Sequence, residues 1–239
     1  MLRSLLTRSF KIFTLFNIPV YLHSSFLIVL GLVALFSPPT GALFLAAYTF
    51  VLMHEFGHCL AAKCCDLEVV SITMTPVGGL AAIADFKHDP KKELLVTFAG
   101  PFVNAALIAF LFPFLLMPQL LPAWLGSLVM TAISINVTLF IFNMIPCFPM
   151  DGGRILRATL ALKYGDLVKG TRIAVSVGKV FAVGFIILGL FTLSIMLVAI
   201  GVIMIFLAKA EYTALRQSEA VDMGDLAEQL RAREEPDVR

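Results

Sequence analysis

Long apolar runs separated by short polar segments dominate the chain, and their lengths predict helices. Runs at 24–36 and 42–62 each suit one helix, and the stretch 94–153, which has no Lys or Arg, suits two at about 20 residues per membrane span. The last apolar stretch, 180–207, would be about 42 Å long as a single helix, which is long for one span and short for two. Basic residues follow it, so we predict a helical hairpin there and six spans in all.

Two shorter segments have the pattern of strands. Segment 67–86, LEVVSITMTPVGGLAAIADF, places β-branched residues before a Pro-x-Gly-Gly turn and predicts a hairpin. Segment 10–23, FKIFTLFNIPVYLH, is strand-like in part. Pro146 and Pro149 should end the fourth span, so the chain at 145–150 is expected to be extended and to line protein or a cavity.

Composition makes lipid the expected solvent. Of 239 residues, 59% are hydrophobic and 14% are charged, and the mean hydropathy is +0.94. Such a chain has too little polar surface to cover a soluble globule. We therefore predict a membrane-embedded domain at 1–208 and a short charged cytoplasmic tail at 209–239. The net charge of +2 is too small to indicate a nucleic-acid partner.

The positions of the charges predict the orientation of the chain. Basic residues cluster at the N-terminus, at 63–93 and in a loop at 154–172, and such clusters mark the cytoplasmic side. Both termini should then be cytoplasmic, in a cell membrane, with the turns at 37–41 and 117–124 facing outward. The predicted fold class is an all-α polytopic membrane protein of about six transmembrane helices. A small β-hairpin or sheet should lie at its cytoplasmic membrane face.

The run FVLMHEFGHCLAAK, 50–63, carries the candidate chemistry. His54 and His58 are four residues apart, about 40° around a helix, so both imidazoles can share a zinc ion. Glu55 between them can act as general base on water. By rise per residue from Lys63, His58 lies about 8 Å and His54 about 14 Å inside the cytoplasmic border. The plain alternative is a pair of neutral histidines bonded to neighbouring helices, with Glu55 protonated.

A catalytic zinc site needs a third protein ligand, which must arrive at the same depth. Asp151 follows the Pro-broken end of the fourth span and is one candidate. It could equally cap a helix beginning at Gly152, and position alone leaves both interpretations open. Gly100 and Asn104 are expected to serve close packing and hydrogen bonding between helices.

The motifs resemble those of a known family. HEFGH at 54–58 followed by NMIPCFPMDGGR at 143–154 is similar to the paired signature of the site-2 proteases, which are intramembrane zinc metalloproteases. TPVGG at 75–79 and GPFVN at 100–104 also resemble motifs of that family. The resemblance covers nearly the whole membrane part, in the form without PDZ or CBS domains.

That resemblance implies a site and an activity. His54, His58 and Asp151 would hold one Zn²⁺ per chain, Glu55 would be the catalytic base, and Asn143 would bind the substrate backbone or the developing oxyanion. The substrate would be a single-span membrane protein, cut in or near its transmembrane segment. It would unwind and add as a strand to the hairpin, where Gly79 is a second expected substrate-binding residue. A separate regulatory membrane protein is a further expected partner, besides the lipid bilayer.

Two other functions stay open at this point. One is a membrane zinc protease of another architecture, acting on soluble or prenylated peptides with a downstream glutamate as third ligand. The glutamates beyond Asp151 all follow the last apolar stretch, which counts against it. The other is a non-proteolytic membrane zinc-binding or transport protein, for which ligands at successive depths would be expected rather than one cluster.

Overall fold

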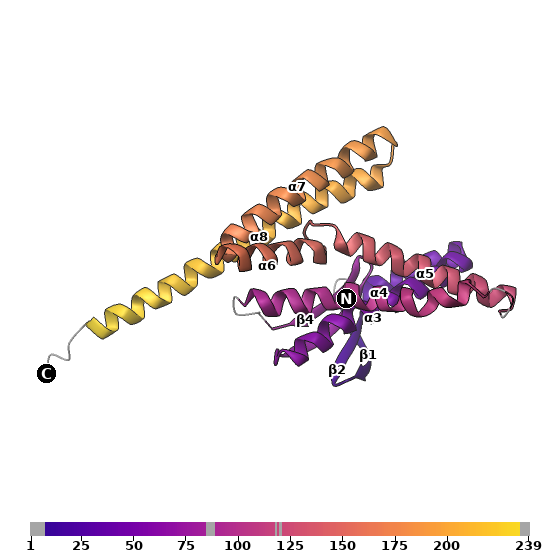
Figure 1. Ribbon diagram of the computed structural model, residues 1–239, viewed down its shortest axis with the longest axis horizontal. Helices are drawn as coiled ribbons and strands as arrows, with labels where there is room; N and C mark the ends of the chain where they lie inside the picture. Colours follow the sequence, from indigo (N-terminus) through magenta and orange to yellow (C-terminus); the bar gives the residue numbers. More distant parts are fainter. Residues whose placement is uncertain (1–7, 85–88, 118, 120, 235–239) are drawn as a thin grey trace. The chain divides into compact units, whose positions relative to one another are not determined.

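The structure is a computed structural model that describes residues 8–84, 89–117, 119 and 121–234, with side chains described as far as residue 217. The chain divides into two compact units, Met1–Met144 and Ile145–Arg239. Figure 1 shows the elements coloured along the sequence. The last two residues of the predicted hairpin segment, 85 and 86, lie outside the described residues.

A four-stranded sheet belongs to the first unit. Its strands are β1 (Ser9–Leu15), β2 (Ile18–His23), β3 (Val69–Thr75) and β4 (Gly78–Ile83), in the order β1-β2-β3-β4. Strands β1 and β2 form one antiparallel hairpin and β3 and β4 another, while β2 and β3 pair in parallel with Val20 opposite Ile72. The hairpin predicted in segment 67–86 is therefore confirmed, and so is the strand character of segment 10–23.

One face of this sheet packs on the helix that carries the histidines. Alternate residues of a strand point to one face, and those of β2 and β3 that are buried form a core with Phe56 and Cys59 of helix α3: Ile18, Val20, Ile72 and Met74. The polar turn of α3 is thus held directly against the sheet.

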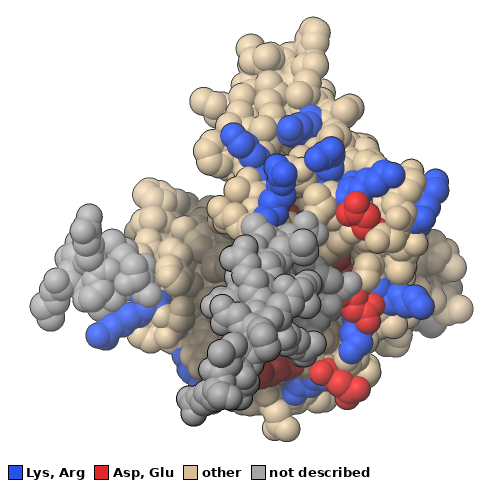
Figure 2. Space-filling view, turned by 90° about the vertical axis from the view of Figure 1, so that its left-hand side faces the viewer, with Lys and Arg blue, Asp and Glu red and all other residues tan. Residues whose placement is uncertain are grey.

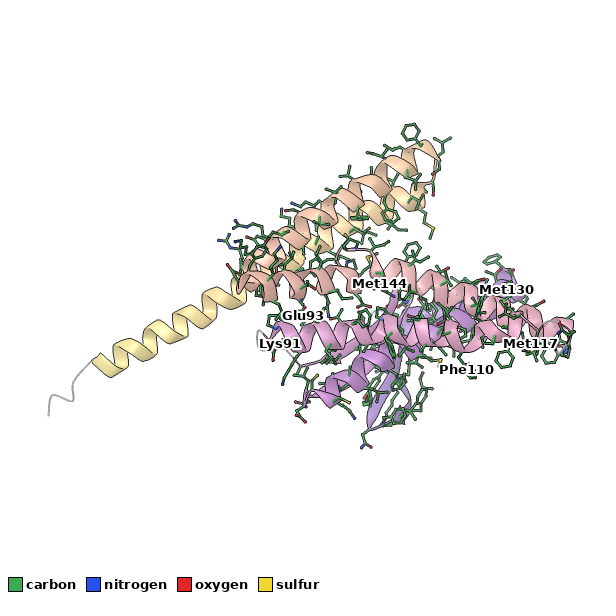
Figure 3. All side chains as sticks on the ribbon, in the orientation of Figure 1. Lys91, Glu93, Phe110, Met117, Met130 and Met144 are labelled. Atoms are coloured by element: carbon green, nitrogen blue, oxygen red, sulfur yellow. The ribbon has the colours of Figure 1, made fainter. Side chains whose placement is uncertain are left out.

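The described part of the first unit also contains four helices: α2 (Ser24–Phe36), α3 (Pro38–Cys64), α4 (Pro90–Leu115) and α5 (Ala123–Met144). The outward turn predicted at 37–41 is shorter than expected, because α3 begins at Pro38, directly after Ser37. Helix α2 has 13 residues, about 20 Å, against a hydrocarbon core of about 30 Å. Figure 3 labels charged Lys91 and Glu93 in the first turn of α4 and apolar Phe110 toward its other end.

The second unit contains α6 (Asp151–Tyr164), α7 (Leu167–Phe191) and α8 (Ile195–Glu234). Helices α7 and α8 form the predicted hairpin, and α8 runs on through residue 209, where the tail is predicted to begin. The basic segment 154–172 differs from the predicted loop, because it forms α6 and the first turns of α7. One of its charges is internal: Arg157 is buried, contacts Glu211 of α8 at 2.6 Å and lies over the ring of Phe148.

The chain is an integral multi-pass membrane protein with a mostly helical fold. Five described helices, α3, α4, α5, α7 and α8, are long and apolar enough to cross a membrane, and α2 supplies a sixth, shorter apolar helix. Large apolar side chains on these helices are exposed, among them Phe110 at 68% and Phe206 at 77%, as expected where lipid is the solvent. Figure 2 shows where Lys, Arg, Asp and Glu side chains reach the surface in one view.

Candidate metal centre

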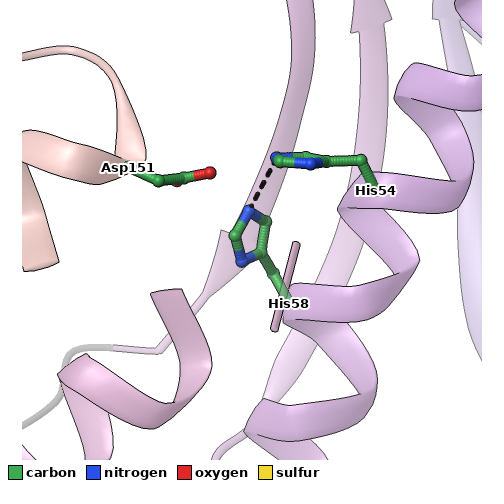
Figure 4. A group of neighbouring side chains, drawn as sticks. All are labelled: His54, His58 and Asp151. Atoms are coloured by element: carbon green, nitrogen blue, oxygen red, sulfur yellow. Dashed lines mark hydrogen bonds between the residues drawn. The ribbon is translucent and has the colours of Figure 1, made fainter. Parts of the chain in front are cut away.

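The two histidines of α3 project from one face of the helix and meet at their ring tips. Only 4% of His54 and 8% of His58 is exposed. Their Nε2 atoms are 3.1 Å apart, and the rings are nearly perpendicular. Figure 4 shows this pair, with the Nε2 contact dashed, and also draws Asp151. The spacing of four residues, one turn along the helix, has placed both imidazoles as the sequence predicts.

Hydrogen bonds from α4 determine which nitrogen of each imidazole carries the proton. The Nδ1 atom of His54 is 2.6 Å from Oδ1 of Asn104, and that of His58 is 2.8 Å from the backbone oxygen of Val96. Amide and backbone oxygens accept and cannot donate, so both Nδ1 atoms carry a proton that they donate. In the neutral rings both Nε2 atoms then present a lone pair.

This donor set fits a zinc ion. Two nitrogen ligands, each about 2.0–2.1 Å from a tetrahedral zinc, lie about 3.3 Å from one another, close to the 3.1 Å between the two Nε2 atoms. Two lone pairs facing each other at this distance repel unless a cation lies between them. A metal-ligating histidine ordinarily donates its other N–H to a carbonyl or carboxylate, as both rings do here.

A glycine of α4 makes room for the imidazole tips. A Cβ atom built on Gly100 would lie 2.3 Å from Nε2 of His58 and 2.8 Å from Cε1 of His54, well inside van der Waals contact. Any side chain at this position would occupy the space beside the ligand nitrogens. Gly100 therefore belongs to the site, beyond the packing role that its sequence context predicts.

Glu55 follows His54 in the sequence and is half-buried. Its side chain lies beneath the β3–β4 hairpin. A Cβ atom built on Gly79 would lie 2.4 Å from Cγ of Glu55 and 2.8 Å from its Oε1. The second residue of β4 thus rests on the carboxylate side chain. Gly79, predicted as a substrate-binding residue, is in this way a neighbour of the predicted catalytic base.

The remaining predicted residues lie in sequence near the boundary between the two units. Helix α5 ends at Met144, one residue after half-buried Asn143, and the segment 145–150 is neither helix nor strand. Asp151 is the first residue of α6. The helix cap is Met150, which makes no side-chain capping bond, so Asp151 does not occupy the cap position that the alternative interpretation gave it. The substrate-binding role of Asn143 stays a prediction.

Sequence reasoning missed the part that α4 and α5 play in holding the histidines. It assigned Asn104 to hydrogen bonding between helices, which is correct, but did not identify His54 as the partner. It did not single out Asn136 of α5, whose Oδ1 accepts a hydrogen bond from Nδ2 of Asn104 at 2.9 Å. The available signal was the occurrence of asparagine inside apolar runs, where an unsatisfied amide is costly.

Comparisons with known proteins find similarity to zinc metalloproteases. The family model of peptidase family M50 matches residues 42–128 and 118–185. A zinc metalloprotease of Methanocaldococcus jannaschii is 34% identical over 210 residues, which make up 85% of this chain and 60% of that relative. A solved structure, a site-2 protease from Methanocaldococcus jannaschii, is similar with a TM-score of 0.60 at 30% identity, over 86% of this chain and 95% of that one. The chain thus spans 60% of the length of the first relative.

Proposed function

The chain belongs to peptidase family M50, and we propose that it is an intramembrane zinc metalloprotease. It hydrolyses a peptide bond in or near the transmembrane segment of a membrane-anchored substrate. Two buried imidazoles carry this proposal, because their Nδ1 atoms both donate to fixed acceptors and their Nε2 atoms converge at 3.1 Å. A carboxylate between two such histidines on one helix is the arrangement of a zinc peptidase.

We propose His54, His58 and Asp151 as the ligands of one zinc ion per chain. Imidazole nitrogen and carboxylate oxygen are ordinary zinc ligands, and three protein ligands leave one position open. Asp151 is supported by its place at the start of α6, immediately after a segment that contains Pro146 and Pro149, and by the NMIPCFPMDGGR motif. Zinc, when bound, supplies Lewis-acid activation of water and of the scissile carbonyl.

Glu55 moves the proton in the proposed reaction. It takes a proton from the attacking water and delivers it to the nitrogen of the departing amine. Its half-buried place beneath Gly79 restricts the carboxylate to a narrow range of positions. Asn143 is proposed to bind the substrate backbone or the developing oxyanion.

The hairpin is the proposed platform for the substrate. In a helix the scissile carbonyl is hydrogen-bonded and sterically covered, so the substrate must unwind locally before it is cut. Strand β4 is the last strand of the described sheet, and an extended peptide can add to such an edge by main-chain hydrogen bonds. A strand bound beside Gly79 would run past Glu55.

The proposed setting is a cell membrane, with both termini cytoplasmic and a single-span membrane protein as substrate. The clusters of basic residues at 63–93 and 154–172 support this orientation. A separate membrane protein that regulates access to the site is a further proposed partner.

A pair of variants tests this function. Glu55→Gln replaces the carboxylate by an amide of the same shape, which cannot take up a proton. The purified protein should still contain zinc, as measured by mass spectrometry, but its rate of hydrolysis should fall by about 10²- to 10⁴-fold. Asp151→Ala removes a proposed ligand and should lower the zinc content itself. Substrates for the assay are the single-span proteins that accumulate uncut in cells carrying Glu55→Gln.

The results separate the alternatives. Hydrolysis that survives Glu55→Gln contradicts the role of Glu55, and unchanged zinc content in Asp151→Ala removes Asp151 from the ligand set. Zinc flux into vesicles that persists in Glu55→Gln, with no hydrolysis by the unsubstituted protein, would instead show a non-proteolytic zinc-binding or transport protein.

A further inference from the structure

Two asparagines lie fully buried in the apolar helices beside the metal centre. Asn104 of α4 and Asn136 of α5 are both 0% exposed. Neither lies next to a metal-ligand candidate in the sequence, and a buried amide in a membrane helix is costly unless its hydrogen bonds are satisfied. Helix packing alone needs no amide at either position, so the pair calls for a chemical explanation.

The two amides form a chain of hydrogen bonds that ends on His54. Nδ2 of Asn136 donates to the backbone oxygen of Ala132 at 2.8 Å. Oδ1 of Asn136 accepts from Nδ2 of Asn104 at 2.9 Å. Oδ1 of Asn104 in turn is 2.6 Å from Nδ1 of His54. Each amide thus donates a hydrogen bond through its nitrogen to one neighbour and accepts one through its oxygen from the other.

The direction of this chain is set at its far end. A backbone oxygen can only accept, so Asn136 must turn its nitrogen toward Ala132 and its oxygen toward Asn104. Asn104 must then donate to Asn136 and turn its oxygen toward His54. That oxygen requires a proton on Nδ1 of His54, which leaves Nε2 as the nitrogen that can bind a metal.

The two histidines differ in how they are held. His58 donates directly to the backbone oxygen of Val96, which no side-chain substitution removes. His54 depends on two side chains, of which the second, Asn136, is bonded to Asn104 and to its own helix. A change at Asn136 should therefore affect one histidine and spare the other.

We propose that Asn136 is a positioning residue that holds His54 in its metal-binding tautomer. Asn136 is oriented by the backbone oxygen of Ala132 and in turn orients Asn104, which accepts the hydrogen bond of His54. The effect on zinc affinity rests on the proposed function, whereas the effect on the tautomer does not. Loss of an outer hydrogen-bond partner of a metal ligand typically lowers metal affinity by about 10- to 100-fold.

The test compares Asn136→Leu with a matched control on the same helix. Asn136→Leu removes both hydrogen bonds and keeps the number and branching of the side-chain heavy atoms. Ser134→Ala removes an exposed hydroxyl that donates to its own helix, at the backbone oxygen of Met130. Nitrogen-15 NMR of the zinc-free full chain, labelled at its 4 histidines, reports the tautomer of each ring. Chelator competition measures the zinc affinity.

We expect His54 to carry its proton on Nδ1 in the unsubstituted protein and in Ser134→Ala. In Asn136→Leu the His54 ring should populate both tautomers, and the zinc affinity should be about 10- to 100-fold lower. The proton of His58 should stay on Nδ1. Adding Asn104→Asp to Asn136→Leu should restore both readouts, because a carboxylate accepts from Nδ1 without help from Asn136. A merely structural role for Asn136 would not be rescued in this way.

Three results would overturn the inference. They are a His54 ring without a proton on Nδ1 in the unsubstituted zinc-free protein, an unchanged His54 tautomer in Asn136→Leu, and equal effects of that variant on His54 and His58. The first needs no variant, so the test holds even where Asn136→Leu fails to fold. A preparation with the expected tautomers but no hydrolysis would contradict the proposed function and leave the positioning role intact.

Discussion

Gly100 is the residue whose substitution most directly tests the geometry of the two histidines. A methyl group there would stand 2.3 Å from Nε2 of His58, so Gly100→Ala must displace an imidazole or separate α3 from α4. Overpacking of this kind costs about 1–3 kcal/mol, which corresponds to about 5- to 150-fold in zinc affinity. Chelator competition on the purified protein measures this loss.

Gly126→Ala is the matched control for Gly100→Ala. Gly126 also lies in a helix of the first unit, and a Cβ atom built on it meets nothing within 4 Å. The Gly126→Ala protein should therefore bind zinc with the same affinity as the unsubstituted protein. Equal affinities in the two alanine variants would show that α4 does not approach the ligand nitrogens as described.

At the scale of single residues, the sequence predicts what depends on local geometry. His54 and His58 face each other because four residues make about one turn of any helix. The bond between His54 and Asn104, 50 residues apart, depends on how α3 packs against α4, which no local pattern contains. An amide in an apolar run indicates a buried hydrogen bond, but it does not identify the partner.

Among the elements, the β3–β4 hairpin offers a test of how the sheet acts on the site. Gly79→Ala would place a methyl group 2.4 Å from Cγ of Glu55 and push the carboxylate away from its position. We expect hydrolysis to fall at least about tenfold, within the range that general-base catalysis contributes, while zinc content is unchanged. Mass spectrometry and the cleavage assay together separate the two effects.

Leu80→Ala provides the comparison for Gly79→Ala. Leu80 is the next residue of β4 and is 63% exposed, so its side chain leaves the sheet on the other face. Its substitution should leave the geometry of Glu55 unchanged. Loss of zinc in Gly79→Ala, or normal cleavage by that variant, would contradict the proposed contact between hairpin and base.

The apolar pattern predicted most elements because a membrane helix needs a long uninterrupted run and a hairpin needs a turn between β-branched segments. It failed for α6, where positive charges suggested a loop. Arg157 of that helix is instead buried, paired with Glu211 and placed over Phe148. A charge that is neutralised by a distant helix cannot be told from a solvated one in sequence.

Across the whole molecule, apolar surface and charge together restrict how the chain can lie in a membrane. Exposed apolar side chains on α4 and α5, such as Phe110 and Leu128, require lipid around both helices. The basic residues lie in the first turn of α4 or before it, and beyond α5, with none in the segment that joins the two helices. A helix pair with this charge distribution should enter and leave the membrane on the cytoplasmic side.

Single cysteines on this helix pair test the orientation. In a background with Cys64→Ser and Cys65→Ser, the remaining Cys59 and Cys147 are buried and should not react with a membrane-impermeant maleimide. Trp124→Cys, at a position 65% exposed at the start of α5, should be labelled in intact cells.

Lys91→Cys, at the start of α4, should be labelled only in inverted vesicles, because its basic neighbourhood is held on the cytoplasmic side. The reverse pattern would place the candidate metal centre and the substrate hairpin near the outer face. Labelling of both positions from the same side would show that α4 does not cross the membrane, which would contradict the multi-pass arrangement on which the proposed site depth depends.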